Sequence, residues 1–280
     1  MTNLADYSDN KSIKMLLIGD SGKGKTGALA SLAAAGKKLR ILDFDNGLPI
    51  LASVLKKMIA EGKAKPDAIS NVIFESCLDD FITVGGKILP KGTPTAFTKG
   101  MNMLTKWKGK DGVDLGNVGS WDKDTILVLD SLSHLSNAAM VYILAINNRS
   151  GEQPYQSDWG QAQEMIEGIL KILYSDAIKC HVIVCAHITY VGGTLNEKTN
   201  QMENQKPHPN SLGQKLPPKI ATYFNTMLQV DTIGLGASTK RIIRTYPNSE
   251  LALKSEILGL PKELPLESGL ADFFRAAGQL

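Results

Sequence analysis

Residues 16–36, LLIGDSGKGKTGALASLAAAG, place three glycines and two lysines between an apolar run and an alanine-rich segment. Either a flexible linker or a loop that binds phosphate could have this composition. The apolar run predicts a buried strand over residues 13–18, and residues 25–35 predict a helix that ends at Gly36. Residues 19–26 also match the pattern G-x-x-x-x-G-K-[ST], in which glycines let backbone N–H groups turn inward around phosphate oxygens. Because a phosphate loop needs a strand before it and a helix after it, the sequence favours this interpretation over a linker.

The loop predicts a nucleotide site with ATP and Mg²⁺ as its ligands. Lys25 would supply a positive charge to the β- and γ-phosphates, and the Thr26 hydroxyl would ligate Mg²⁺. The N-terminus of the following helix adds the positive end of its dipole. The residues expected to cradle the phosphates are Gly19, Asp20, Ser21, Gly22, Lys23, Gly24, Lys25, Thr26 and Gly27.

Composition narrows the class of protein further. A chain of 280 residues with 43% hydrophobic residues can bury a substantial core in one or two domains. Its net charge of +3 is too small to indicate a nucleic-acid partner by itself. The three cysteines form no disulfide framework, which is typical of a reducing cytoplasm. The sequence shows neither the apolar core of a signal peptide nor a membrane-spanning stretch, so we expect a cytoplasmic protein with no membrane partner.

Apolar runs alternate with helical patterns along the chain. Strands are expected at residues 13–18, 39–44, 71–75, 125–129 and 181–186, and helices at 25–35, 48–61, 95–107, 132–146, 158–174 and 270–277. Asp158 and Gln161 are expected to cap the helix at 158–174, and residues 190–216 are expected to form a long polar loop. Because the strands are continuous apolar runs, they indicate an α/β fold with a mostly parallel sheet covered on both faces by helices.

The domain organisation follows from the same pattern. Residues 226–233 and 241–246 are expected to pair as a C-terminal β-hairpin. We expect an N-terminal extension over residues 1–12, one ATPase core over 13–257, and a C-terminal tail with a short helix over 258–280.

Two predicted strands end in carboxylates. The strand TILVLD ends at Asp130, which is the candidate for the second Mg²⁺ contact, although an Asp here could also cap the next helix. Asp43 and Asp45 share one face of an extended segment at the strand end where ligands bind in open α/β sheets. Asp45 lies further out and is the candidate to activate water, while Asp43 could orient lysine or water. The alternative for both is a turn before Asn46 and Gly47.

His187 follows the strand HVIVCA at the same edge of the sheet. It is a candidate γ-phosphate sensor, and a packed, hydrogen-bonded histidine is the alternative. Together with Cys180, His181 and Cys185 it matches no usual zinc spacing, and on a strand Cys180 faces away from the other three. A tetrahedral zinc site from these four residues is therefore not expected.

Five segments together resemble the core of the RecA/RadA recombinases, most closely the small bacteriophage RecA-like ATPases of single-strand annealing and recombination. They are GDSGKGKT, ILDFDNGL, ILVLDSLSHL, SDWGQ and VIVCAHIT, and the likeness runs over about residues 13–250. The resemblance implies a RecA-like P-loop NTPase core with DNA-stimulated ATP hydrolysis and single-stranded DNA as partner. It also implies a homo-oligomer, either a filament or a ring, in the host cytoplasm if the protein is phage-encoded. A single-stranded-DNA-binding protein is a further candidate partner.

The resemblance also implies roles for individual residues. Asp45 takes the place of the glutamate that activates water in RecA, and its side chain is one carbon shorter. His187 takes the place of the glutamine that reports the γ-phosphate to the DNA-binding loop. Lys215 and Lys219 lie near the position from which RecA reaches lysines into the neighbouring subunit's ATP. The chain lacks the large accessory domains of full recombinases, so we expect binding and annealing rather than strand exchange.

Three segments are candidates for DNA contact. By resemblance, residues 147–157 and 191–216 fall where RecA-like proteins carry their two DNA-contacting loops. Residues 81–110 hold six lysines and no acidic residue, with Phe97 and Trp107 between them. This pattern suits phosphate contact with base stacking, but a solvated lysine-rich face is the alternative.

Other nucleotide-dependent functions share parts of this pattern. A helicase or packaging-type motor would have the same core, and a small-molecule phosphotransferase would have the same loop. The long loop over 190–216 holds no arginine of the kind expected in a phosphotransferase lid. The Asn-Lys-x-Asp motif of a GTPase is absent from the sequence.

Overall fold

A central sheet carries the fold. The computed structural model describes residues 11–109, 112–196, 201–203, 205–234, 236–247 and 251–280. In these residues eight strands form one sheet in the order β16-β15-β14-β1-β9-β8-β2-β3. Their bounds are β1 Lys14–Ile18, β2 Lys38–Asp43, β3 Val72–Ser76, β8 Thr125–Asp130, β9 His181–Ala186, β14 Thr226–Ile233, β15 Lys240–Arg244 and β16 Glu263–Pro265. Strands β14 to β3 are parallel, and β15 pairs antiparallel with β14, so the mostly parallel sheet and the C-terminal hairpin are confirmed.

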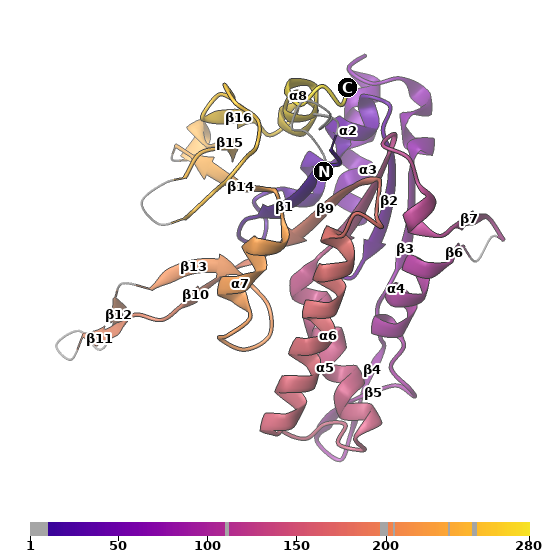
Figure 1. Cartoon of the computed structure of the whole chain (residues 1–280), viewed down its shortest axis with the longest axis vertical. Helices are drawn as coiled ribbons and strands as arrows, with labels where there is room; N and C mark the ends of the chain where they lie inside the picture. The colour runs from indigo at the N-terminus through magenta and orange to yellow at the C-terminus, as the bar shows by residue number, and fades with distance from the viewer. Residues whose placement is uncertain (1–10, 110–111, 197–200, 204, 235, 248–250) are drawn as a thin grey trace, which may run out of the picture.

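Helices cover both faces of the sheet (Figure 1). One layer contains α1 Lys25–Ala28, α2 Ala30–Ala34, α3 Leu48–Ala60 and α8 Gly269–Ala276, and the other contains α4 Ala96–Thr105, α5 Leu132–Ile146 and α6 Gln156–Tyr174. Along β1, Leu16 and Ile18 pack toward the α4–α6 layer, whereas Met15 and Leu17 pack toward the other. Since the central strands are buried on both faces, their sequences are continuous apolar runs. The predicted helix over 25–35 is interrupted at Leu29, between α1 and α2.

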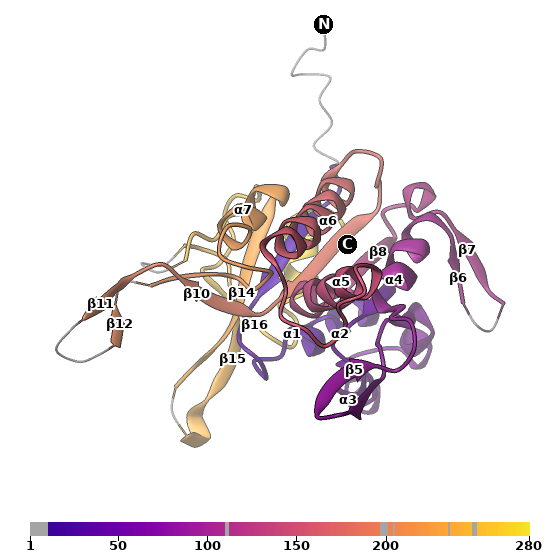
Figure 2. The same cartoon turned by 90° about the horizontal axis from the view of Figure 1, so that it is seen from below.

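The segment after β9 differs from the predicted long loop. Strands β10 Ile188–Val191 and β13 Lys206–Pro209 pair antiparallel, and β11 Thr194–Asn196 pairs with β12 Gln201–Glu203 further out. They form a ribbon that projects away from the body of the molecule (Figure 2). The sequence ITYV at its start is rich in strand-forming residues, which the polarity of the segment as a whole conceals. Part of the predicted DNA-contacting loop, including Lys198, lies outside the described residues.

Residues 81–124 contain two further hairpins. Strands β4 Phe81–Val84 and β5 Lys87–Pro90 are joined by Gly85 and Gly86, whose φ angles of 56° and 78° suit a tight hairpin turn. Strands β6 Trp107–Lys108 and β7 Asp114–Gly116 pair after α4. The remaining short elements are the 3₁₀ helices η2 Pro66–Asn71, η3 Val118–Ser120, η4 Ala221–Tyr223 and η5 Gly236–Ser238, and helix α7 Pro217–Ile220. Of the lysines in this segment, Lys87, Lys99 and Lys108 lie in these elements, Lys91 and Lys106 lie between them, and Lys110 lies outside the described residues. Phe97 and Trp107 are buried in the core, so the prediction that bases stack on them is wrong.

A buried carboxylate closes the connection between α5 and α6. The backbone N–H of Tyr155 donates to Asp158 at 2.8 Å, the Asn147 amide donates at 2.9 Å, and the Arg149 guanidinium pairs with the same carboxylate. Helix α6 begins at Gln156, so Asp158 lies inside its first turn and caps the helix through the backbone N–H of Tyr155, whereas the sequence predicts a capping pair with Gln161. Asp158 also ties both ends of the connection together.

Candidate nucleotide site

The glycine-rich loop leads from β1 directly into α1. Gly22 and Gly24 have φ angles of 76° and 109°, in the left-handed region that favours glycine. At Gly19 a Cβ atom would lie 2.6 Å from the carbonyl oxygen of Val230 on the neighbouring strand β14. These glycines therefore fix the path of the loop, and its tip at Ser21 and Gly22 is exposed.

Lys25 lies beneath this loop and is only 5% exposed. Its ammonium donates to the carbonyl oxygens of Gly19 at 2.8 Å and Asp20 at 3.1 Å, and it lies 3.2 Å from Nδ1 of His187. Because an ammonium has no lone pair, Nδ1 is the acceptor, and the proton of a neutral His187 ring is on Nε2. Burial lowers the pKa of Lys25, and the charges of Asp130 and Asp45 oppose that change.

Thr26 and Asp130 form the part of the site that fits Mg²⁺. The Thr26 hydroxyl donates to Oδ2 of Asp130 at 2.6 Å, and Asp130 is fully buried at the end of β8. Its other oxygen, Oδ1, receives no hydrogen bond from the described residues. Burial raises the pKa of Asp130, and the nearby carboxylates of Asp45 and Asp43 raise it further. A hydroxyl and a buried carboxylate with a free oxygen are oxygen ligands that suit Mg²⁺, whose charge would offset this repulsion.

Asp43 has a different environment from Asp45. It is 2% exposed, and its Oδ1 accepts hydrogen bonds from the backbone N–H groups of Asp45 at 3.2 Å and Gly47 at 3.3 Å. Asp43 therefore shapes the turn after β2, as the turn alternative for this pair predicts. Asp45 lies on that turn and reaches into the open part of the site.

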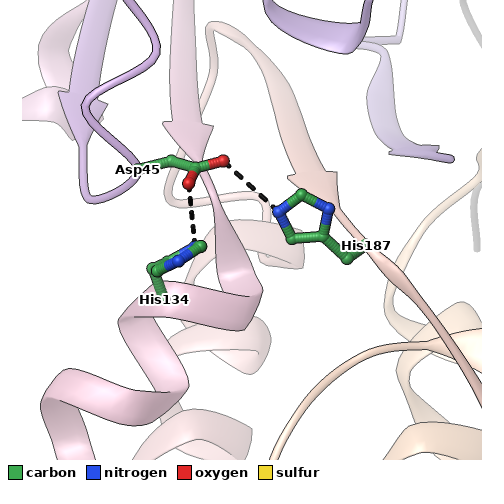
Figure 3. A group of neighbouring side chains, drawn as sticks. All are labelled: Asp45, His134 and His187. Carbon is green, nitrogen blue, oxygen red and sulfur yellow. Dashed lines mark ion pairs between the residues drawn. The ribbon is translucent and has the colours of Figure 1, made fainter. Parts of the chain in front are cut away.

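Two histidines converge on the Asp45 carboxylate (Figure 3). Nδ1 of His134 lies 3.1 Å from Oδ1, and Nε2 of His187 lies 3.3 Å from Oδ2. Burial alone would raise the pKa of Asp45, but the hydrogen bond from His187 and the charges of His134 and Lys25 outweigh it and hold that pKa below its usual value. The chain of contacts from Lys25 through His187 to Asp45 and His134 joins the phosphate loop to α5.

The sequence pattern alone does not single out His134. It lies in the first turn of α5, four residues after Asp130, within the quoted segment ILVLDSLSHL. The first turn of a helix that follows a buried strand faces the ligand edge of the sheet, and this position is the one signal that could have identified it.

His187 also forms the root of the ribbon. Its carbonyl oxygen accepts from the N–H of Asn210 at 2.7 Å, and its own N–H donates to the Ser133 hydroxyl at 3.1 Å. The Ser133 hydroxyl in turn donates to the carbonyl oxygen of Asn210 at 3.1 Å. His187, which contacts Lys25, is therefore also bonded to the residue that follows β13 and to α5.

Three lysines of the predicted site have other surroundings. Lys23 donates to the Thr232 hydroxyl at 2.6 Å and lies 3.6 Å from Asp231, so its ammonium turns toward β14. Lys215 and Lys219 are exposed near α7, beyond the ribbon. In the described part of the chain neither makes a hydrogen bond or ion pair with the phosphate loop, so the structure does not bring them to this subunit's own site.

A cavity of about 1160 Å³ borders the phosphate loop at Gly24 and Gly27, and Asp45 is not among its lining residues. It lies between α1–α3 and the segment from β15 to α8, and its walls include Gly24, Gly27, Val54, Arg241 and Leu266. Its walls are partly apolar and its mouth adjoins the loop, so it has the character of a pocket for an organic group attached to the phosphates.

A glycine-rich loop around a buried lysine, with threonine and a buried aspartate beside it, defines the class of P-loop nucleotide-binding proteins. Comparison with family models gives a match to the AAA domain over residues 11–256. The chain belongs to this AAA domain family and is a P-loop ATPase with a mostly parallel α/β core. The match does not test the resemblance to bacteriophage recombinases, which stays a prediction.

Similar solved structures have low sequence identity to this chain. A KaiC-like protein from Pyrococcus horikoshii OT3 is 11% identical with a TM-score of 0.43, over 91% of this chain and 85% of its own. The flagellar accessory protein FlaH from Methanocaldococcus jannaschii is 11% identical with a TM-score of 0.43, over 93% of this chain and 89% of its own. A search of curated protein sequences finds no match. None of the helices in the described ranges has the length and hydrophobicity that crossing a bilayer requires.

Proposed function

We propose that this protein binds and hydrolyses ATP, binds single-stranded DNA, and promotes annealing or recombination as a homo-oligomer. One observation carries the proposal: His187 contacts Lys25 through its side chain and anchors the projecting ribbon through its backbone. A change at the γ-phosphate would therefore act directly on the base of the segment where a RecA-like protein contacts DNA.

The nucleotide would lie across the loop between the two sides of the site. Lys25 would contact the β- and γ-phosphates, and Thr26 and Asp130 would hold Mg²⁺, which supplies charge stabilisation to the phosphates when bound. The base and sugar would occupy the cavity beside Gly24 and Gly27. The γ-phosphate would then face Asp45 and His187.

Hydrolysis requires a group that orients and deprotonates water. Asp45 is the candidate, since it is more exposed than Asp43 and Asp130 at the strand ends and stays ionised at neutral pH. His187, which donates to Asp45 when Lys25 is its partner, would be released as Lys25 turns to the phosphates.

Assembly would supply a further cation. In the described residues no arginine contacts the phosphate loop through a hydrogen bond, and Lys215 and Lys219 are exposed beside the stiff segment Leu-Pro-Pro. A lysine from a neighbouring subunit would stabilise charge on the γ-phosphate only in the oligomer, which would couple hydrolysis to assembly on DNA.

The test is ATP turnover as a function of protein concentration, with and without single-stranded DNA, alongside negative-stain images of the same samples. Turnover should rise more than linearly with protein concentration and rise further with DNA, and DNA affinity should fall steeply with salt. The Lys215→Ala/Lys219→Ala variant should bind ATP normally and lose the DNA-stimulated part. The Lys38→Ala/Lys65→Ala variant removes the same charge from exposed positions at the opposite edge of the sheet and serves as the control.

Two results would redirect the assignment. Turnover that is linear in protein concentration and unchanged by DNA contradicts the DNA-coupled mechanism and favours a small-molecule phosphotransferase. Translocation along duplex or forked DNA would instead assign the helicase or packaging-motor alternative.

A further inference from the structure

Asp45 lies beside two histidines, His134 and His187. Water activation needs only the carboxylate, whereas all three side chains have atoms that can ligate a metal ion. They come from the turn after β2, the first turn of α5 and the end of β9, and one atom from each lies within 4.8 Å of the other two (Figure 3). Their side chains are 25%, 42% and 18% exposed, so a further ligand such as water has room on the open side.

Two of the separations are close to those between ligands of one metal ion, and the third, between the histidine nitrogens, is within 4.8 Å. Zinc ligands lie about 2.0–2.1 Å from the metal, which places tetrahedral ligands roughly 3.4 Å from one another. The two Asp45 oxygens lie 3.1 Å and 3.3 Å from the histidine nitrogens that face them. Two imidazoles and one carboxylate are a ligand set for zinc, cobalt, nickel or iron(II), and not for Mg²⁺, which prefers oxygen.

The same distances also fit hydrogen bonds. Nδ1 of His134 lies 3.1 Å from the Ser131 hydroxyl as well, which can turn its proton away, and at His187 the position of Lys25 decides between a hydrogen bond and a metal contact. While Lys25 donates to Nδ1 of His187, the ring proton must be on Nε2, where it blocks a metal and donates to Asp45. If Lys25 moves away, that proton can occupy Nδ1, and Nε2 presents a lone pair toward Asp45 and His134.

We propose that Asp45, His134 and His187 bind one divalent transition-metal ion, separate from the Mg²⁺ site at Thr26 and Asp130, and that Lys25 competes with this ion for His187. A nucleotide that draws Lys25 to its phosphates strengthens metal binding, and by linkage the metal strengthens nucleotide binding equally. The bound ion also withholds the Asp45 carboxylate from water. Metal binding itself does not rest on the proposed function, whereas this inhibition of hydrolysis does.

The experiment measures binding of Co²⁺ and Zn²⁺ to tag-free protein without nucleotide, by visible absorption and calorimetry, in excess Mg²⁺ to occupy oxygen-ligand sites. Lys25→Met removes the competitor, so it should bind one ion per chain at least about tenfold more tightly than wild type. Loss of a partner outside the ligand shell costs about 10–100-fold in affinity, and His134→Ala removes a ligand, so it should cost at least as much.

Two more variants make the result specific. His187→Ala removes a ligand from another element and should have the same effect as His134→Ala, with unfolding midpoints confirming that both fold. His208→Ala, on β13 away from the cluster, is the matched histidine control and should bind as wild type does. Absence of binding in both wild type and Lys25→Met, or unchanged binding in His134→Ala, overturns the site. Equal affinity in wild type and Lys25→Met overturns the competition.

Discussion

Replacing Lys25 by methionine tests the phosphate loop most directly, because it removes the charge and keeps most of the side-chain volume. Without nucleotide, Lys25 is buried and its pKa is lowered by that burial, so its charge costs free energy in the folded state. The variant loses two hydrogen bonds to carbonyl oxygens and one to His187, and it relieves this cost. We therefore expect a free energy of unfolding that is unchanged or higher in the absence of ATP.

In the presence of ATP the variant should instead be less stable than the wild type. A hydrogen bond to a charged group contributes about 1.5–3 kcal/mol, so the variant should bind ATP roughly 10- to 150-fold more weakly. At an ATP concentration of about 100 times the wild-type Kd, binding stabilises the wild type by about 2.7 kcal/mol and the variant by about 0.3–1.4 kcal/mol. At roughly 2 °C per kcal/mol, the Tm shifts are about 5 °C for wild type and 1–3 °C for the variant.

Thermal unfolding with and without Mg-ATP measures both stability differences in one assay. Steady-state turnover should be abolished in the variant. The matched control is Lys23→Met in the same loop, since the Lys23 ammonium faces Thr232 and Asp231 rather than the site. The control should retain the wild-type shift. A wild-type shift and wild-type turnover in Lys25→Met would refute the assignment of the phosphate loop.

Asp45→Asn should leave ATP affinity unchanged and slow turnover by roughly 10²–10⁴, because the amide keeps the shape and loses the basic oxygen. Asp43→Asn keeps an oxygen for the turn and should retain turnover within about tenfold, and if Asp43→Asn alone abolishes turnover, Asp43 is the base. Val54→Trp should fill the cavity beside Gly27 and weaken binding of ATP but not of inorganic tripolyphosphate, as measured by calorimetry. Val84→Trp, at an exposed position, is the control. If both ligands lose affinity equally, the nucleoside binds elsewhere. Burial lowers the pKa of His181 to about 3, whereas its pKa in the unfolded chain is near 6.5. Between these two values the unfolded chain binds more protons, so the free energy of unfolding decreases as the pH falls below about 6.5. This group should cost the wild type about 1.2 kcal/mol between pH 7 and 5.5, and His181→Leu should remove that part of the slope in urea unfolding.

The sequence predicts those features that depend on residues close together in the chain. The strand before the phosphate loop, the loop itself and the helix after it are adjacent in the chain, and each supports the assignment of the next. Asp130 and Asp45 could be placed because parallel strands end at one edge of a sheet. The assembly of Lys25, Asp45 and His187 follows from the same rule.

What the sequence did not predict depends on pairing between distant residues. The ribbon forms because Ile188–Val191 meets Lys206–Pro209 across an intervening polar segment, and a pattern of polarity cannot report that register. His134 can contact Asp45 and lie beside His187 only because the turn after β2 and the end of β9 come close to α5 in the folded chain. Asp158 was expected to begin its helix, but its carboxylate is occupied by groups on the connection before the helix.

The α5–α6 connection has a consequence for how a polyanion would meet this protein. Residues 147–157 contain a single basic residue, Arg149, and its charge is already compensated by the buried carboxylate of Asp158. Because this charge is already neutralised within the protein, a phosphate contact made at this connection would displace no condensed cation from the nucleic acid. The salt dependence of any nucleic-acid binding must then originate from basic residues elsewhere, and the measured slope of affinity against salt counts those residues and leaves this connection out.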